Sequence, residues 1–366
     1  MRRLSIFCFL FAVSVSAASG QSNCTIDLPV GVLGTDYSLL TGLTPTDLTV
    51  RVGKQQRPII AVNYDAGPRR IVFVVDDSQD LAPDAHKAEV KLIEHILSSA
   101  RPEDSFALLT ARGAPHDAGF VTGRDAVLKA ANGILADPRQ KDKGRGVLDA
   151  LMQAINWFGE PQRGDAIFTM AASLEEKPDD GRSGFINEQG RLVAIDQGPK
   201  AGPISKISVK VLYQALYQHR IRVFGIDLGT FPLMNPGNPG SMGLALDESA
   251  VYSSGFPPLF VNGPSAPSEN NLFELSYFTG GFAIWENTQN PRHVYELTND
   301  RLKKLEHKVL QAYGAITRFY LLRVQAPDIP GTRWELKLPK DLEKNTRLVY
   351  PREFSLCAEA NSAGMK

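Results

Sequence analysis

The sequence has few cysteines, no excess of charge of either sign, and a single long apolar run near its start. Three cysteines in 366 residues are too few for a disulfide-bonded scaffold or a zinc cluster. The 40 basic and 40 acidic side chains balance, so no net charge favours nucleic acid or an anionic membrane surface. With 43% apolar residues the composition argues against disorder and against a coiled coil, and the length suits one large domain with additions, or two domains.

The long apolar run has the setting of an export signal. Arg2 and Arg3 precede a run from residue 4 to residue 15, and small residues follow it up to Gly20. This order is typical of a secretory signal peptide, and the run is too short to span a bilayer comfortably. We therefore expect residues 1–20 to be removed, the protein to be periplasmic or secreted, and no membrane span to remain in the mature chain.

The cysteines that survive such a cleavage lie near the two ends of the chain. Cleavage removes Cys8 and leaves Cys24 and Cys357. Because an oxidising compartment favours pairing of two cysteines, we expect a Cys24–Cys357 disulfide. Two separate buried thiols are the alternative.

Strand and helix patterns alternate through the middle of the chain. Continuous apolar runs typical of buried strands predict strands at 71–75, 105–110, 118–122, 166–170, 222–228 and 282–285. Amphipathic patterns predict helices that begin at Pro83 and that cover 147–158, 211–219, 272–278 and 302–313. This alternation predicts an α/β fold, with a Rossmann-like, mostly parallel sheet and helices on both faces.

The flanking segments, residues 47–62 and 316–354, carry strand patterns without helices. Strands from the two ends are therefore expected to form one small accessory sheet, a β appendage to the α/β core. The expected division is a signal peptide (1–20), an N-terminal β segment (21–68), the α/β domain (69–314), a C-terminal β segment (315–357) and a tail (358–366). Two long insertions, 175–204 and 231–268, interrupt the domain. The first is expected to contain a hairpin near 185–193.

The clearest chemical feature is the end of the first core strand. Asp76, Ser78 and Asp80 follow this strand with one residue between each. In open α/β sheets, ligand sites form beyond the carboxyl ends of the strands. Carboxylate and hydroxyl oxygens are ligands for hard cations such as Mg²⁺, so this loop is a candidate cation site.

Several motifs occur together in a characteristic order. They are the segments 43–54, 69–78, Arg101-Pro102-Glu103-Asp104, Leu148-Asp149-Ala150-Leu151 and Thr279-Gly280-Gly281. Over residues 44–350 the chain resembles a von Willebrand factor type A domain, and most of all the exported, acidobacterial branch of that family. The resemblance implies a metal-ion-dependent adhesion site formed by Asp-x-Ser-x-Ser, a Thr from a second loop and an Asp from a third, with the metal shell completed by a partner's carboxylate.

The chain keeps only part of that family site. Asp76 and Ser78 match, and Asp80 stands at the position of the second Ser. The second loop has Lys143 and Arg145 but no Ser or Thr, and the third has no Asp, since the strand end is Met-Ala-Ala-Ser. We expect an inactive remnant in which Lys143 or Arg145 replaces the charge of the metal. Weak Mg²⁺ binding at Asp76, Ser78 and Asp80 is the alternative, and no other cofactor is expected.

The expected function is that of a non-catalytic binding or adhesion module for an unknown protein partner. Apolar residues in the proline-rich insertion are the candidate contact points: Phe231, Met234, Phe256 and Phe260. These side chains either bind the partner or pack down over the remnant site. Two further alternatives are a structural component of an envelope assembly and an enzyme with Asp76 as nucleophile. Esterase and phosphate-loop motifs are missing from the sequence. The six histidines show no paired metal spacing, and His86 and His95 are expected on a helix surface.

Overall fold

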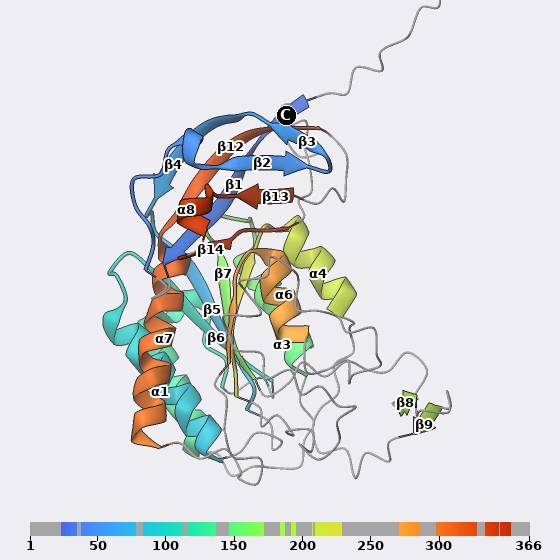
Figure 1. Ribbon diagram of the computed structural model, residues 1–366. Helices are drawn as coiled ribbons and strands as arrows, with labels where there is room; N and C mark the ends of the chain where they lie inside the picture. Colours follow the sequence, from blue (N-terminus) through green and yellow to red (C-terminus); the bar gives the residue numbers. More distant parts are fainter. Residues whose placement is uncertain are drawn as a thin grey trace, which may run out of the picture.

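The computed structural model describes residues 23–34, 38–77, 83–111, 113, 116–136, 146–171, 184–186, 192–194, 207, 209–228, 271–285, 298–327, 334–343 and 345–352. Figure 1 shows these residues as a layered α/β part with a β part at one end. The predicted fold class is confirmed, with a parallel sheet between helices and antiparallel sheets built from both ends of the chain.

The central sheet contains five strands, all parallel to their neighbours. In sequence order they are β5 (Arg70–Val75), β6 (Ser105–Thr110), β7 (Ala166–Ala171), β10 (Arg222–Asp227) and β11 (Ala283–Trp285). Their order across the sheet is β11-β10-β7-β5-β6. The strand patterns therefore located every strand of this sheet.

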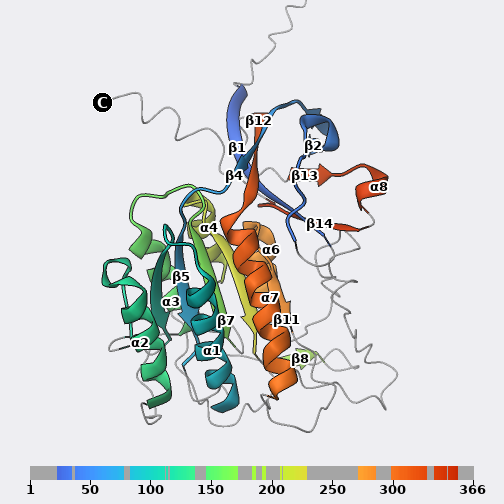
Figure 2. The same cartoon turned by 90° about the vertical axis from the view of Figure 1, so that its left-hand side faces the viewer.

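Helices cover both faces of the sheet because its strands are apolar on both sides. In β5, Ile71, Phe73 and Val75 belong to one apolar cluster, while Val72 and Val74 belong to another. The first cluster is closed by the helices that Figure 2 shows in front of the sheet, α1 (Pro83–Ser99), α2 (Gly123–Ala136) and α7 (Asn299–Thr317). The second is closed by α3 (Val147–Phe158), α4 (Val209–Gln218) and α6 (Asn271–Thr279).

The β part differs from the prediction of one accessory sheet, because the chain ends build two. A four-stranded antiparallel sheet has the order β14-β1-β12-β4, from β14 (Thr346–Val349), β1 (Asn23–Gly34), β12 (Phe319–Pro327) and β4 (Ile59–Asp65). A second sheet contains β13 (Trp334–Lys337), β2 (Thr49–Val52) and β3 (Gln55–Arg57). A third apolar cluster takes residues from both sheets, since one apolar sheet face needs a second layer to cover it.

Three local features also bear on the predictions. The expected strand at 118–122 is wrong: only Ala118 pairs, by a single bridge to Leu108, and the 3-10 helix η2 (Phe120–Thr122) follows. The hairpin expected near 185–193 is confirmed, as β8 (Gly184–Ile186) pairs with β9 (Leu192–Ala194). Two short helices lie in the β part, η1 (Pro45–Asp47) and α8 (Lys340–Glu343).

The Thr279-Gly280-Gly281 motif has a steric explanation. The backbone N–H of Val223 donates to the Thr279 hydroxyl oxygen at 3.0 Å, which ties the end of α6 to β10. Gly280 has a φ of +82°, and a Cβ there would lie 2.3 Å from the nitrogen of Pro351. A Cβ on Gly281 would lie 1.8 Å from the carbonyl oxygen of Val223. Only glycine fits at both positions.

The Arg101-Pro102-Glu103-Asp104 motif clamps the amino end of the parallel sheet. The Arg101 guanidinium donates to both carboxylate oxygens of Asp104, at 2.7 and 3.0 Å, and to the carbonyl oxygens of residues 66–67. The Arg69 backbone N–H and the Tyr313 hydroxyl also donate to Asp104. Burial alone would raise the pKa of Asp104, but these hydrogen bonds lower it below its ordinary value. The motif thus fixes the connection from β4 to β5.

A second clamp at the same end uses Arg70. Its guanidinium bonds both oxygens of Asp165, at 2.9 and 2.6 Å. It also donates to the carbonyl oxygens of Phe158 and Glu160, at 2.7 and 2.8 Å. Arginine forms such forked contacts because its donors are coplanar and spaced to match a carboxylate. The start of β5 is thereby joined to the end of α3 and the start of β7.

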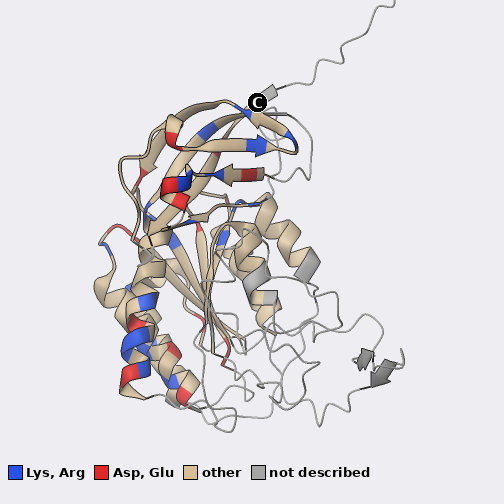
Figure 3. Ribbon diagram, viewed as in Figure 1, with Lys and Arg blue, Asp and Glu red and all other residues tan. Residues whose placement is uncertain are grey.

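Figure 3 shows charges of both signs along α1 and α7. This pattern is typical of solvated helix faces. Among the described residues, no helix combines the length and the apolar character needed to cross a lipid bilayer.

Candidate functional site

The carboxyl ends of the central strands meet where the order of the strands reverses. Along the chain, β6 lies on one side of β5, whereas β7, β10 and β11 follow on the other side. The connections that leave β5 and β7 therefore diverge, so the topological switch point of the sheet lies between these two strands. Asp76 follows β5 at this point, and its backbone N–H donates to the carbonyl oxygen of Met170 in β7 at 2.9 Å. The predicted site residue Asp76 thus lies at the switch point.

Two further acidic side chains lie close to Asp76. Asp76 and Asp77 are 5% and 2% exposed, and Glu89, from the second turn of α1, is completely buried. Burial first, and then the charges of Asp76 and Asp77, raise the pKa of Glu89 well above its ordinary value. We call Asp76, Asp77 and Glu89 the acidic cluster. Within it, the two aspartates make ionisation of Glu89 less favourable.

His86 provides a polar partner for the acidic cluster. Its Nδ1 atom lies 3.2 Å from Oε2 of Glu89, one turn along α1. The other carboxylate oxygen of Glu89, Oε1, is buried without a hydrogen-bond partner. His86 is only 4% exposed, so the expectation that it lies on the helix surface is wrong. Its ring lies against the buried carboxylate of Glu89 on the same helix.

The ends of β6 and β7 lie on either side of the end of β5. Beside β5, the backbone N–H of Thr110 donates to Oδ1 of Asp117 at 3.0 Å, and that of Gly113 donates to the Thr110 hydroxyl at 3.0 Å. These bonds close the turn after β6. On the other side β7 ends at Ala171, which packs in an apolar cluster. The last described residue of β7 therefore carries a methyl group and no oxygen ligand.

Sequence reasoning missed Glu89, although the sequence carries a signal for it. The buried face of α1 includes Ala85, Leu92 and Ile96. Glu89 lies four residues after the first of these and three before the second, which is the spacing of one helix face. An acid inside an apolar stripe predicts a buried carboxylate. That stripe begins directly after the loop that carries Asp76.

The other predicted site residues lie outside the part of the chain that the structure describes. They are Ser78, Asp80, Lys143, Arg145, Phe231, Met234, Phe256, Phe260 and Cys357. Cys24 lies in β1, opposite Ala326 of β12, but its predicted partner Cys357 is among the undescribed residues. The pairing of these two cysteines stays a prediction.

The described residues do not fit a metal centre. Of the candidate ligands only Asp76 is described, and β7 contributes no oxygen side chain at its end. Within the described ranges, no group of three or more His, Cys, Asp or Glu side chains is arranged to hold a metal ion. An octahedral Mg²⁺ ion needs several oxygen ligands at about 2.1 Å. The described residues alone supply too few of these ligands to hold the ion.

Known proteins give no close match. No protein-family model matches the chain, and no curated protein matches it. Solved structures that resemble it include proximal thread matrix protein 1 from the mussel byssus, with 12% identity over 72% of this chain and a TM-score of 0.39. This chain covers 50% of that mussel protein.

Two bacterial structures resemble the chain at similar levels. An aerotolerance-related membrane protein from Bacteroides fragilis shares 13% identity, over 66% of this chain and 98% of that one, with a TM-score of 0.35. The vWF domain of the type V pili tip protein Mfa5 from Porphyromonas gingivalis shares 12% identity, over 45% of this chain and 83% of that one, with a TM-score of 0.28. At such identities and scores these likenesses carry no argument about what the chain binds.

Proposed function

We propose that this chain is an exported, non-catalytic protein-binding module of the von Willebrand type A kind, and that it binds its partner at the carboxyl edge of the parallel sheet. The observation that carries the proposal is the position of Asp76 at the switch point between β5 and β7, where its N–H reaches Met170. Open α/β sheets bind their ligands at this switch point.

The acidic cluster supports a binding role for this edge. Burial of Glu89 beside Asp76 and Asp77 disfavours its ionised form, because that carboxylate loses solvation and is repelled by the two neighbouring acids. Proteins accept such destabilised groups mainly at functional sites.

The proposed surface includes the start of the proline-rich insertion. The chain leaves β10 at Leu228, whose backbone N–H donates to the carbonyl oxygen of Ala171 at 2.9 Å. The insertion therefore begins at the same edge as Asp76. We propose Phe231, Met234, Phe256 and Phe260 as apolar contacts and Lys143 or Arg145 as the replacement for a metal charge. Packing of the four apolar side chains over the remnant site is the alternative.

Cross-linked capture from the exported fraction of the source cells tests this function. The bait is the full mature chain, compared with Asp76→Asn and with the control Glu335→Gln, which alters an exposed acid of β13 that pairs with Lys337. Quantitative mass spectrometry should find a protein that the wild type and the control capture equally and the Asp76 variant captures at least several-fold less. Circular dichroism and urea denaturation show whether each bait is folded.

Two other outcomes point to the alternative functions. Equal capture by all three baits, together with elution in one large complex on gel filtration, would support a structural role in an envelope assembly and overturn the proposed surface. A covalent phosphoryl or acyl adduct on Asp76, detected by mass spectrometry of the isolated protein, would support an enzyme that uses Asp76 as nucleophile.

A further inference from the structure

Three arginines from separate segments of the chain converge on Asp27, where the α/β part meets the β part. Arg323 of β12 lies opposite Asp27 of β1 and donates from Nε and Nη2 to its two carboxylate oxygens, at 2.9 and 3.1 Å. Arg163, in the connection from α3 to β7, donates to the same carboxylate at 3.1 Å. The hydrogen bond from Arg323 is the largest cause of the lowered pKa of Asp27, and the charges of Arg163 and Arg220 contribute to it. We call Arg163, Arg220 and Arg323 the arginine cluster.

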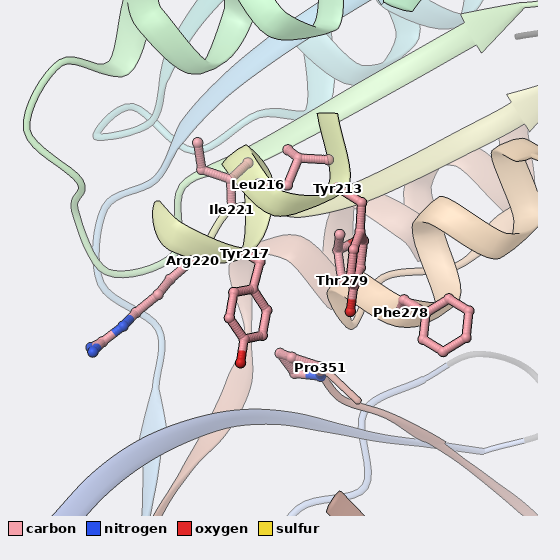
Figure 4. A pocket seen from close by; sticks show the side chains of 8 residues that line it. All are labelled: Tyr213, Leu216, Tyr217, Arg220, Ile221, Phe278, Thr279 and Pro351. Atoms are coloured by element: carbon pink, nitrogen blue, oxygen red, sulfur yellow. The ribbon is translucent and has the colours of Figure 1, made fainter. Parts of the chain in front are cut away.

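Arg220 has a backbone conformation that arginine rarely adopts. Among the described residues it is the only one other than glycine with a positive φ, +55°. Its N–H and that of Ile221 donate to the carbonyl oxygens of Tyr217 and Leu216, at 3.2 and 3.0 Å, and so close the end of α4. Glycine is the usual residue at such a helix end. Figure 4 shows the Arg220 side chain at the rim of a small pocket, extending away from the other side chains that line it.

Stability alone does not account for the arginine cluster. The side chains of Arg163 and Arg323 are 58% and 48% exposed, and ion pairs between solvated side chains contribute little to folding. The positive φ of Arg220 opposes folding, because its Cβ crowds the backbone. Backbone strain of this kind is found mainly where a side chain has a function. The cluster therefore has the character of a binding site.

Positive charge is in excess around the cluster. The charge of Arg163 also lowers the pKa of Asp65, whose carboxylate accepts a hydrogen bond from Arg69 at 2.7 Å. Arg222 is buried beside them, where burial first and then the charge of Arg69 lower its pKa to about 9, so it is still charged at neutral pH. Before Arg220 is counted, four guanidiniums are thus linked to two carboxylates. They leave two positive charges to attract an anion.

The exposed arginines have donors to offer an anion. Within the described part of the chain, Arg163 uses only Nη2 in hydrogen bonds, and Arg323 uses only Nε and Nη2. A guanidinium carries five N–H donors in a planar fork that matches the oxygens of phosphate and carboxylate groups. Because Asp27 holds these two guanidiniums side by side, a ligand need not order them when it binds.

We propose that the arginine cluster is a binding site for a doubly charged tetrahedral oxyanion, a sulfate or phosphate group, with Arg163 and Arg323 as its hydrogen-bond donors and Arg220 as a third positive charge. Asp27 is the positioning residue that keeps the two donors together. The two surplus positive charges favour a dianion over a single carboxylate. The site lies at the opposite end of the sheet from Asp76, so it does not depend on the proposed partner surface.

Titration of the full mature chain with inorganic sulfate tests the site. Nuclear magnetic resonance signals of arginine Nε–H groups should shift and saturate in the millimolar range, at pH 7 and constant ionic strength, since salt screens such attraction. Arg163→Gln and Arg323→Gln should each weaken binding at least about fivefold, the effect of losing a hydrogen bond to a charged group. The control Arg51→Gln, which removes an exposed arginine of β2, should bind like wild type. Absence of saturation, or equal loss in Arg51→Gln, would overturn the proposal.

Arg220→Gly separates the role of the side chain from that of the backbone. Glycine accepts the positive φ, so urea denaturation should find this variant at least as stable as wild type. Its affinity for sulfate should nevertheless fall, by about twofold or more, because one positive charge is lost. Unchanged affinity in Arg220→Gly would remove Arg220 from the site.

The choice of anion distinguishes the possible sources of the group. Inorganic phosphate and sulfate are compared with phenyl phosphate and phenyl sulfate, and with acetate as a carboxylate. Equal affinity for the ions and their esters supports a free ion as the ligand, whereas tighter binding of an ester supports a group carried on a larger molecule. Acetate should bind at least several-fold more weakly than sulfate. Acetate binding as tight as that of sulfate would overturn the preference for a dianion.

Discussion

Buried carboxylates have different neighbours at the two ends of the parallel sheet. At the amino end, the buried carboxylates Asp104 and Asp165 each receive an arginine fork, from Arg101 and Arg70. At the carboxyl end, Asp76, Asp77 and Glu89 are buried close together, and one oxygen of Glu89 has no hydrogen-bond partner. The amino end thus pairs two buried acids with arginines, whereas at the carboxyl end burial and two neighbouring acids disfavour ionisation of Glu89.

The directions of the pKa shifts agree with this contrast. The pKa of Asp104 is lowered, because hydrogen bonds from Arg101, Tyr313 and Arg69 outweigh its burial. The pKa of Glu89 is raised, because burial and two neighbouring acids act together. A lowered carboxyl pKa means that ionisation stabilises the fold, and a raised one means that ionisation opposes it. The two ends of the sheet should therefore respond to pH with opposite signs.

The largest expected effect comes from breaking the amino-end clamp with Asp104→Asn. Removing one partner of a buried ion pair leaves Arg101 charged and poorly solvated, which typically costs about 3 to 5 kcal/mol. Because the Arg101 side chain is 18% exposed, we expect the lower end, about 3 kcal/mol in the free energy of unfolding. Urea denaturation at pH 7 measures it.

A matched control and the pH response sharpen this prediction. Glu94→Gln removes an exposed ion pair with Lys91 and should cost less than about 0.5 kcal/mol. Since the folded pKa of Asp104 lies below the unfolded value of 3.8, the stabilisation is fully present above pH 3.8 and is lost as the pH falls through the folded pKa. Wild type and Asp104→Asn should converge in acid. A loss below about 1 kcal/mol at pH 7 would show that the clamp contributes little.

The next effect has the opposite sign and comes from Glu89→Gln at the carboxyl end. The folded chain holds the Glu89 proton above the ordinary pKa of 4.5, so it binds more protons than the unfolded chain and stability falls as pH rises. Each pH unit of that range costs up to about 1.4 kcal/mol. Glu89→Gln removes this cost and should be more stable than wild type at pH 7 by at least about 1 kcal/mol.

The difference between Glu89→Gln and wild type should shrink as the pH falls towards 4.5, and it should vanish below that value, where Glu89 is protonated in both the folded and the unfolded chain. Glu103→Gln is the control, because it removes an acid that is 46% exposed at the amino end and should not alter the pH profile. Thermal unfolding followed by circular dichroism between pH 4.5 and pH 8 provides the comparison. If Glu89→Gln is less stable than wild type across this range, ionisation of the buried Glu89 does not destabilise the folded chain.

The core of the fold could be predicted because its strands are buried on both faces. β6 and α3 occur at the predicted residues, 105–110 and 147–158, since a continuous apolar run and a regular apolar stripe are local signals. The stretch 118–122 is apolar too, but only Ala118 pairs with the sheet. Whether an apolar run pairs with a neighbouring strand depends on tertiary contacts with residues outside the run.

The β part and the site show the same limit. Strand patterns at both chain ends indicated an appendage, but the division into two sheets depends on pairings such as β1 with β12, nearly 300 positions apart along the chain. At the site, the strand end identified Asp76, whereas Glu89 and His86 come from α1. Charged residues on an amphipathic helix are usually solvated, so only the spacing from Ala85 to Leu92 indicates that Glu89 is buried.

The smallest expected effect concerns Mg²⁺, and it tests whether the loop with Asp76, Ser78 and Asp80 binds a metal ion. The loop before α3 and the end of β7 lack the Thr and the Asp that a von Willebrand type A metal site would need, so few oxygens are left to replace the water around the ion. With a dissociation constant no tighter than the millimolar concentration supplied, Mg²⁺ stabilises the fold by at most about 0.4 kcal/mol. The melting temperature should therefore shift by less than about 2 °C, with the same small shift in Asp104→Asn at the opposite end. If calorimetric titration instead finds micromolar Mg²⁺ affinity that is abolished by Asp76→Ala and retained in Glu335→Gln, the carboxyl end of the sheet is a cation-binding site.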